Sequence, residues 1–208
     1  MQEWIEYLKF LVPIATFGLG VWATPLIEAR KEKAKATSVQ KNLILEIEDE
    51  LSELPKRLRK MASTLKSLIS LKAGIAEKFG IIKYVPRSTS SYFLKSATEA
   101  SFSLFNKYQR YAIKSLFVRI SSIEEYLQAI KSIEVTDETL DEAIKNCKRY
   151  LFTGTCMLNT MRVIASKPQA DPVGEYRKVI EAIFSELDIE LTVDELKVVS
   201  TTRFEEVG

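Results

Sequence analysis

Residues 140 to 165 read LDEAIKNCKRYLFTGTCMLNTMRVIA and carry the most regular apolar pattern of the chain. Their apolar and small residues recur at alternating intervals of four and three positions. They are Leu140, Ile144, Cys147, Leu151, Gly154, Leu158, Met161 and Ala165. This spacing is typical of a helix that packs along one seam against neighbouring helices. It predicts an all-α protein built as a helical bundle.

Two longer helices are predicted before this stretch. One apolar face repeats from Leu43 to Leu68 with the same spacing, and Pro55 within it predicts a kink. A second apolar face predicts a helix over residues 91–133. A connection with Gly, Pro and Ser/Thr signals, residues 74–90, separates the two helices. We therefore expect a long antiparallel helical hairpin, about 60 Å in length at 1.5 Å per residue.

Two shorter helical elements are predicted towards the C-terminus. Pro168 ends the helix of residues 140 to 165, and Asp171, followed by a proline, predicts the start of a fourth helix. Thr192 and Glu195 have the spacing of a capping box. Residues 191–208 are therefore expected to form a short capped turn and a frayed acidic tail.

The N-terminal segment predicts a membrane anchor. Residues 10–27 carry no charge and, as a helix, cover roughly 27 Å, close to the thickness of a bilayer core. The basic residues that follow them predict, by the positive-inside rule, an N-terminus outside and a cytoplasmic body. We expect a single-pass protein of the cell inner membrane or plasma membrane. Residues 1–35 would be the transmembrane anchor with its basic flank, and residues 36–190 the cytoplasmic bundle.

Two other interpretations of the same segment stay open. A cleaved signal peptide is one of them, because Val21 and Ala23 are small residues at signal-peptidase spacing. A buried core helix is the other, since eighteen residues lie near the lower limit for spanning a membrane. Within the anchor, Thr16, Gly20 and Thr24 recur every fourth residue, a pattern that lets two helices pack closely. It allows homo-oligomers formed through the anchor; alternatively, these positions reflect only that small residues are common in membrane helices.

The composition argues against an enzyme. The 208 residues include no histidine and two cysteines, which excludes Ser-His-Asp and Cys-His catalysis and His-ligated metal sites. The sequence has no phosphate-binding or dinucleotide-binding glycine motif. We expect no cofactor, no metal and no catalytic residue. Cys147 lies on the predicted seam and is interpreted as a core residue.

The charges are unevenly distributed along a chain whose net charge is +2. Residues 54–120 contain 14 basic and 2 acidic residues, whereas residues 169–208 contain 4 basic and 10 acidic residues. In an antiparallel hairpin, the basic residues would gather at one tip and attract an anionic partner. The candidate binding residues are Lys56, Arg57, Arg59, Lys60, Lys107, Arg110 and Lys114. Alternatively, the acidic C-terminal segment neutralises these residues within the molecule.

Three functions follow from this pattern. The first is a non-catalytic, membrane-tethered interaction or scaffold protein that recognises an acidic protein through the basic tip. The second is an oligomerising effector that perturbs the membrane, because the layout resembles the small single-pass helical proteins of bacterial phage-defence and toxin loci. The third is a membrane-anchored nucleic-acid-binding protein, since residues 106–114 interleave aromatic and basic side chains as single-strand binders do.

Overall fold

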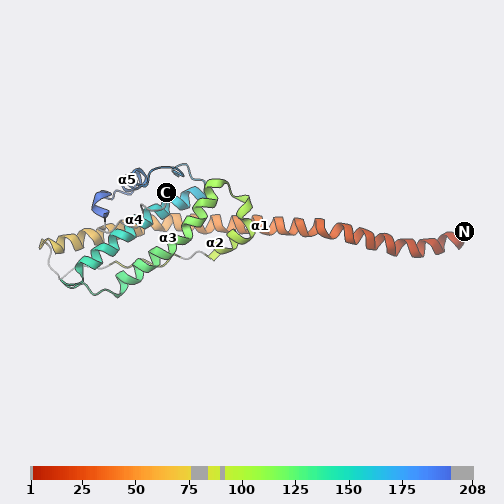
Figure 1. The fold of residues 1–208 in the computed structure, drawn as a ribbon, viewed down its shortest axis with the longest axis horizontal. Helices are drawn as coiled ribbons and strands as arrows, with labels where there is room; N and C mark the ends of the chain where they lie inside the picture. The colour runs from red at the N-terminus through yellow and green to blue at the C-terminus, as the bar shows by residue number, and fades with distance from the viewer. Residues whose placement is uncertain (1, 76–83, 90–91, 198–208) are drawn as a thin grey trace, which may run out of the picture.

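The computed structural model describes residues 2–75, 84–89 and 92–197, with side chains from residue 15 onward. These residues contain five α-helices and no strand, so the predicted all-α class is confirmed (Figure 1). The helices are α1 (Gln2–Lys72), α2 (Tyr92–Ser96), α3 (Lys107–Ser132), α4 (Leu140–Ile164) and α5 (Tyr176–Glu186). Three short helical turns accompany them: a π-helical turn (Ala97–Ser101) and two 3-10 turns (Phe102–Leu104 and Asp194–Leu196).

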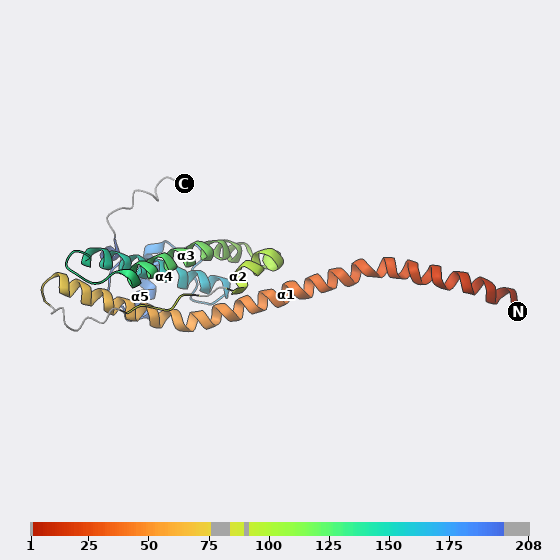
Figure 2. The same cartoon turned by 90° about the horizontal axis from the view of Figure 1, so that it is seen from below.

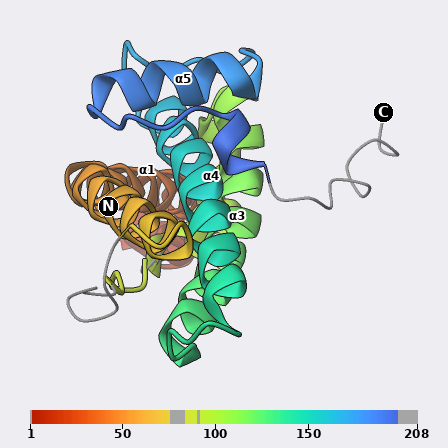
Figure 3. The same cartoon turned by 90° about the vertical axis from the view of Figure 1, so that its left-hand side faces the viewer.

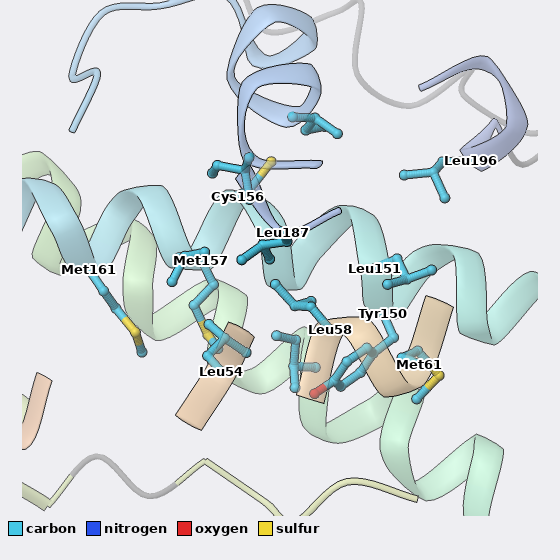
Figure 4. Close-up of a cluster of buried hydrophobic side chains, with 14 of the residues drawn as sticks. Leu54, Leu58, Met61, Tyr150, Leu151, Cys156, Met157, Met161, Leu187 and Leu196 are labelled. Atoms are coloured by element: carbon cyan, nitrogen blue, oxygen red, sulfur yellow. The ribbon is translucent and has the colours of Figure 1, made fainter. Parts of the chain in front are cut away.

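Helix α4 is the centre of the bundle. Of its 25 residues, 17 are buried, and it lies between α1 and α3 with α5 across it (Figure 3). The predicted seam is buried from Leu140 to Met161, and Cys147 is a core residue as expected. Leu54, Leu58 and Met61 of α1 lie in the same buried cluster as the apolar side chains of α4 (Figure 4). Each fully buried leucine of this kind contributes about 1.5–3 kcal/mol through removal of its side chain from water.

A glycine allows α1 and α4 to approach each other closely. A Cβ atom added at Gly154 would lie 2.8 Å from Cδ2 of Leu58, closer than real Cβ contacts. Leu58 has no exposed surface, so its side chain has little room to retreat. The glycine in the α4 seam is therefore explained by the helix that crosses it.

Helix α1 is continuous from Gln2 to Lys72, and its C-terminal half forms one wall of the bundle. Its apolar face is buried from Leu43 to Leu68 as predicted. Pro55 lies within this helix and does not divide it into two. The N-terminal part of α1 extends beyond the bundle (Figures 1 and 2). We call residues 15–27 the α1 extension.

Helix α3 runs parallel to α1, which corrects the predicted antiparallel hairpin (Figure 1). The carbonyl of Leu104, just before α3, accepts a hydrogen bond from Gln40, which lies near the middle of α1 where the bundled part begins. Helix α4 begins at the other end of the bundle, where Lys72 pairs with Asp141. The packed antiparallel partner of both α1 and α3 is therefore α4, not the segment that follows α1.

The described part of the predicted connection, residues 84–89, is extended as expected and runs back along α1. We call residues 84–89 the return segment, and it lies beside α1 (Figure 2). The expected helix over 91–133 is also interrupted, because Asn106 and Gln109 form a capping box that starts α3 anew. In that box the Asn106 side chain accepts from the Gln109 N–H, and the Gln109 side chain accepts from the Asn106 N–H. A helix start inside an apolar period is hard to detect by periodicity alone.

The structure also corrects the predicted membrane anchor. Among residues with described side chains, no helix is long and apolar enough to cross a membrane. A bilayer core is about 30 Å thick. The single-pass anchor, its orientation and the inner-membrane or plasma-membrane placement are therefore not supported.

The C-terminal region covers α4 on the side away from the return segment. Helix α5 begins at Tyr176, four residues later than the expected start, because Asp171 caps a turn instead. Its Oδ1 accepts hydrogen bonds from the N–H groups of Val173 and Gly174 at 3.1 and 2.6 Å. The predicted capping box of Thr192 and Glu195 is present. The expected frayed tail falls largely on residues 198–208, outside the described residues.

Candidate interaction surface

The predicted basic residues lie in two separate groups. Lys56, Arg57, Arg59 and Lys60 occupy the middle of the bundled part of α1, whereas Lys107, Arg110 and Lys114 occupy the first two turns of α3. The first turn of α3 adjoins the end of α4, because Gln109 donates a hydrogen bond to the carbonyl of Ile164 at 2.8 Å. The structure therefore does not gather the seven residues at one tip of a hairpin.

The group on α1 is engaged by the protein itself. Lys56 pairs with Glu53 at 2.6 Å, and Arg59 Nε donates to the carbonyl of Leu187 at 3.0 Å. The ammonium group of Lys60 lies 5.2 Å from the ring centre of Tyr84. Further along α1, Lys66 pairs with Glu190 of the acidic C-terminal segment at 2.6 Å. On α1, Lys56 and Lys66 are thus neutralised by acids of the same chain.

Arg57 is the most deeply engaged of the four. It is buried and donates hydrogen bonds to Glu50, to the hydroxyl of Thr89 and to the carbonyl of Arg87. Burial raises the pKa of Glu50, and the positive charge of Arg57 partly opposes this shift. Burial also raises the pKa of the nearby Tyr150 hydroxyl. These groups fasten the return segment to α1, and their role is structural.

The group on α3 has no acidic partner. Within the described residues, Lys107, Arg110 and Lys114 form no ion pair, and the sequence has no acidic residue between Glu99 and Glu124. Arg110 donates to the carbonyl of Phe105 at 2.6 Å. Lys114 lies 5.7 Å from the ring centre of Phe102. Since neither contact neutralises the charge, this part of α3 presents a net positive surface.

Apolar side chains lie exposed among these cations. Tyr108 is 51% exposed, Tyr111 63% and Val118 67%, so the two tyrosines are surface residues and not part of the core edge. Residues 107, 111, 114 and 118 are separated by four, three and four positions and share one side of the helix. We call Lys107, Tyr108, Tyr111, Lys114 and Val118 the α3 face. Its tyrosines are of a residue type enriched at protein interfaces, and its lysines supply a positive field that attracts acidic groups.

The residues predicted to pack anchors together remain on the α1 extension. The hydroxyl of Thr24 donates to the carbonyl of Gly20 within the same helix at 2.7 Å. A Cβ atom at Gly20 would meet nothing within 4 Å. Thr16 lies on the same side, four residues earlier.

A polar hollow of about 470 Å³ between α4 and α5 was not anticipated from the sequence. Arg162 forms a bidentate pair with Glu186 there, at 2.8 and 2.5 Å. Asn159 exchanges two hydrogen bonds with the main chain of Asp171. Because these polar groups are paired with one another, they hold α5 and the turn before it against α4. Among the described residues, no group of three or more His, Cys, Asp or Glu side chains is arranged to hold a metal ion.

Comparisons with known proteins found no match to this chain, neither among protein-family models, nor among curated proteins, nor among solved structures. The geometry and charge of the α3 face are therefore the features that indicate a function.

Proposed function

We propose that this protein is a non-catalytic interaction module that binds an acidic protein partner through the α3 face. The observation that carries the proposal is the contrast between two groups of cations. On α1, Lys56, Arg57 and Lys66 pair with acids of the same chain, whereas no described acid pairs with Lys107, Arg110 or Lys114. Cations without an internal acid keep a positive field that attracts an external acidic group and accelerates its encounter.

The exposed apolar side chains favour a protein over other anions. Val118 is exposed on the same side of α3 as Tyr111, and apolar groups of this kind contribute to binding by leaving water. A partner that presents acidic residues around an apolar stripe, such as an acidic amphipathic helix, matches both features. Tyr108 and Tyr111 are also compatible with base stacking, so binding of single-stranded nucleic acid is an outcome that the experiment must distinguish.

The experiment measures binding by fluorescence anisotropy of two labelled probes at low and high salt. One probe is a peptide with glutamate and leucine at helical spacing, and the other is an oligothymidylate. We expect the peptide to bind and its affinity to fall with salt. The charge reversal Lys107→Glu with Lys114→Glu is expected to abolish that binding.

The matched control reverses Lys56→Glu and Lys178→Glu, which lie outside the α3 face and change the net charge equally. This control is expected to retain peptide binding. Equal losses in both variants would show a general charge effect and no defined surface. Binding of the oligothymidylate in place of the peptide would replace the acidic protein with nucleic acid as the partner.

A further inference from the structure

Helix α3 carries two opposite seams. The inner seam is buried and consists of Ile113, Leu116, Ile123, Leu127 and Ile130. The outer side carries a second row at alternating intervals of four and three residues, and none of its members is buried. This outer row consists of Lys107, Tyr111, Lys114, Val118, Ser121 and Glu125. A row with this repeat is the geometry along which a second helix packs.

The outer row changes sign along its length. Its first half has Lys107 and Lys114 with no acid nearby, and its second half has the exposed Glu125. In the described residues, no cation pairs with Glu125. The outer row of one helix therefore carries cations in its first half and an exposed acid in its second half.

We propose that the acidic partner of the α3 face is a second copy of this chain, bound through its own α3 in antiparallel orientation. This inference rests on the proposed function and names its partner. An antiparallel arrangement places Lys114 of each copy opposite Glu125 of the other, so that each ion pair occurs twice. A parallel arrangement would instead place Lys107 against Lys107, and like charges repel.

The centre of the row suits a two-fold contact. Val118 and Ser121 lie on either side of the midpoint between Lys114 and Glu125. An antiparallel pair therefore brings Val118 of one copy to Ser121 of the other. The small serine lets the two helices approach, and the exposed Val118 and Tyr111 leave water on contact. The same surface is used by both copies, as an isologous dimer requires.

The first test is a charge-swap series on the full chain, followed by sedimentation equilibrium at low and high salt. We expect a dimer for the natural sequence. Either single change, Lys114→Glu or Glu125→Lys, is expected to weaken dimerisation by about tenfold or more, because it replaces two attractions by two repulsions. The double change restores both pairs with reversed polarity and should return the dimer. A double variant as weak as the single ones would overturn the proposed pairing.

The second test locates the contact. Ser121→Cys places a thiol near the two-fold axis, whereas Gln128→Cys places one about 25 Å from its counterpart along antiparallel helices. Cys147 and Cys156 are buried, so the introduced thiol is the accessible one. A short bismaleimide is expected to link two copies of the Ser121→Cys variant and not of the Gln128→Cys variant. Equal linking at both sites would mean that the copies associate elsewhere, for example through the α1 extension.

The double variant also separates this inference from the proposed function. It should recover the dimer and still bind the acidic peptide poorly, because the peptide needs a cation at position 114. Excess acidic peptide should dissociate the natural dimer by competing for the α3 face. A chain that stays monomeric, yet binds the peptide through Lys107 and Lys114, would refute the second copy and leave the proposed function standing. Peptide binding that ignores both lysines would refute the two together.

Discussion

Nη1 of Arg57 in α1 donates a hydrogen bond to Oγ1 of Thr89, 3.2 Å away and 32 residues later in the chain. Thr89 in turn donates to the carboxylate of Glu50 at 3.0 Å. Both Arg57 and Thr89 are buried. The return segment is therefore fastened to α1 by a buried polar network at a place where the sequence predicted packing between two helices.

Replacing Arg57→Leu should destabilise the protein by about 3 kcal/mol, because it leaves the carboxylate of Glu50 buried without its cation. The measurement is urea unfolding followed by circular dichroism. Lys56→Leu is the control, since Lys56 is the neighbouring cation and its side chain is 61% exposed. The control should change the free energy of unfolding by less than about 0.5 kcal/mol. Similar losses in both variants would contradict a special role for Arg57.

The pH dependence of stability reports on Glu50. Burial raises its pKa above the ordinary 4.5, so above that pH the native state binds more protons at this site than the unfolded chain does. The contribution of Glu50 to stability is therefore present at low pH and is lost as the pH rises through the raised value. We expect the free energy of unfolding of the natural protein, minus that of Glu50→Gln, to fall as the pH rises from 4 to 7. An increasing difference would mean that the attraction of Arg57 outweighs burial.

Enlarging Gly154 tests the close approach of α1 and α4. Gly154→Leu should destabilise the protein by about 2 kcal/mol or more, because the new side chain must displace Leu58. Gly154→Ala should have a smaller effect, since the better helix propensity of alanine offsets part of the clash by about 1 kcal/mol. Adding Leu58→Ala should recover part of the loss caused by Gly154→Leu. Thermal unfolding of the natural protein, Gly154→Leu, Leu58→Ala and the double variant provides the cycle. Strict additivity of their effects would argue against the contact.

Helix α5 should loosen when Arg162 loses its partner. Glu186→Ala removes both hydrogen bonds to this buried guanidinium group, so we expect faster amide hydrogen exchange across α5, by about tenfold for each 1.4 kcal/mol lost. Glu181→Ala lies on the same helix and removes an exposed pair with Arg177. It should leave the exchange of α5 nearly unchanged. Uniform acceleration across α4 as well would indicate global destabilisation and not local opening.

A surface position and a core position of α3 should differ in their effect on the free energy of unfolding. Val118→Asp should leave the free energy of unfolding within about 0.5 kcal/mol of the natural value, because Val118 is exposed. Ile113→Ala should lower it by about 2–5 kcal/mol, since Ile113 has no exposed surface. Chemical unfolding measures both, at protein concentrations low enough to keep the chain monomeric. A large effect of Val118→Asp on stability would show that the α3 face is covered by the chain itself.

The sequence predicted the helices whose apolar residues pack along one seam. It did not predict the arrangement of segments that are held by polar contacts. Spacing alone located the buried faces of α1 and α4, because apolar periodicity records which side of a helix leaves water. It could not show that the connection between α1 and α3 runs back along α1, so that α3 lies parallel to it. That path depends on Arg57 and Glu50, which lie far from Thr89 in the sequence and show no period. The two groups of cations were separated for the same reason.

The α3 face could be predicted only in part. The alternation of aromatic and basic residues over residues 106–114 was visible in the sequence, but the exposure of Tyr108 and Tyr111 was not. Their position follows from the capping box at Asn106, which sets the phase at which α3 begins. The acids of the C-terminal segment were expected to neutralise the cations generally. Glu190 does so for Lys66 on α1, whereas no described acid reaches α3.

The central position of α4 has a consequence for synthesis of the chain on the ribosome. The apolar face of α1 is complete at Leu68, yet the helix that covers it starts only at Leu140. At 5–20 residues per second, that face waits roughly 4–14 s for its partner. Helices α3 and α4 are neighbours in sequence and can pair as soon as both emerge. We therefore expect the apolar face of the nascent α1 to stay accessible to chaperones until α4 emerges.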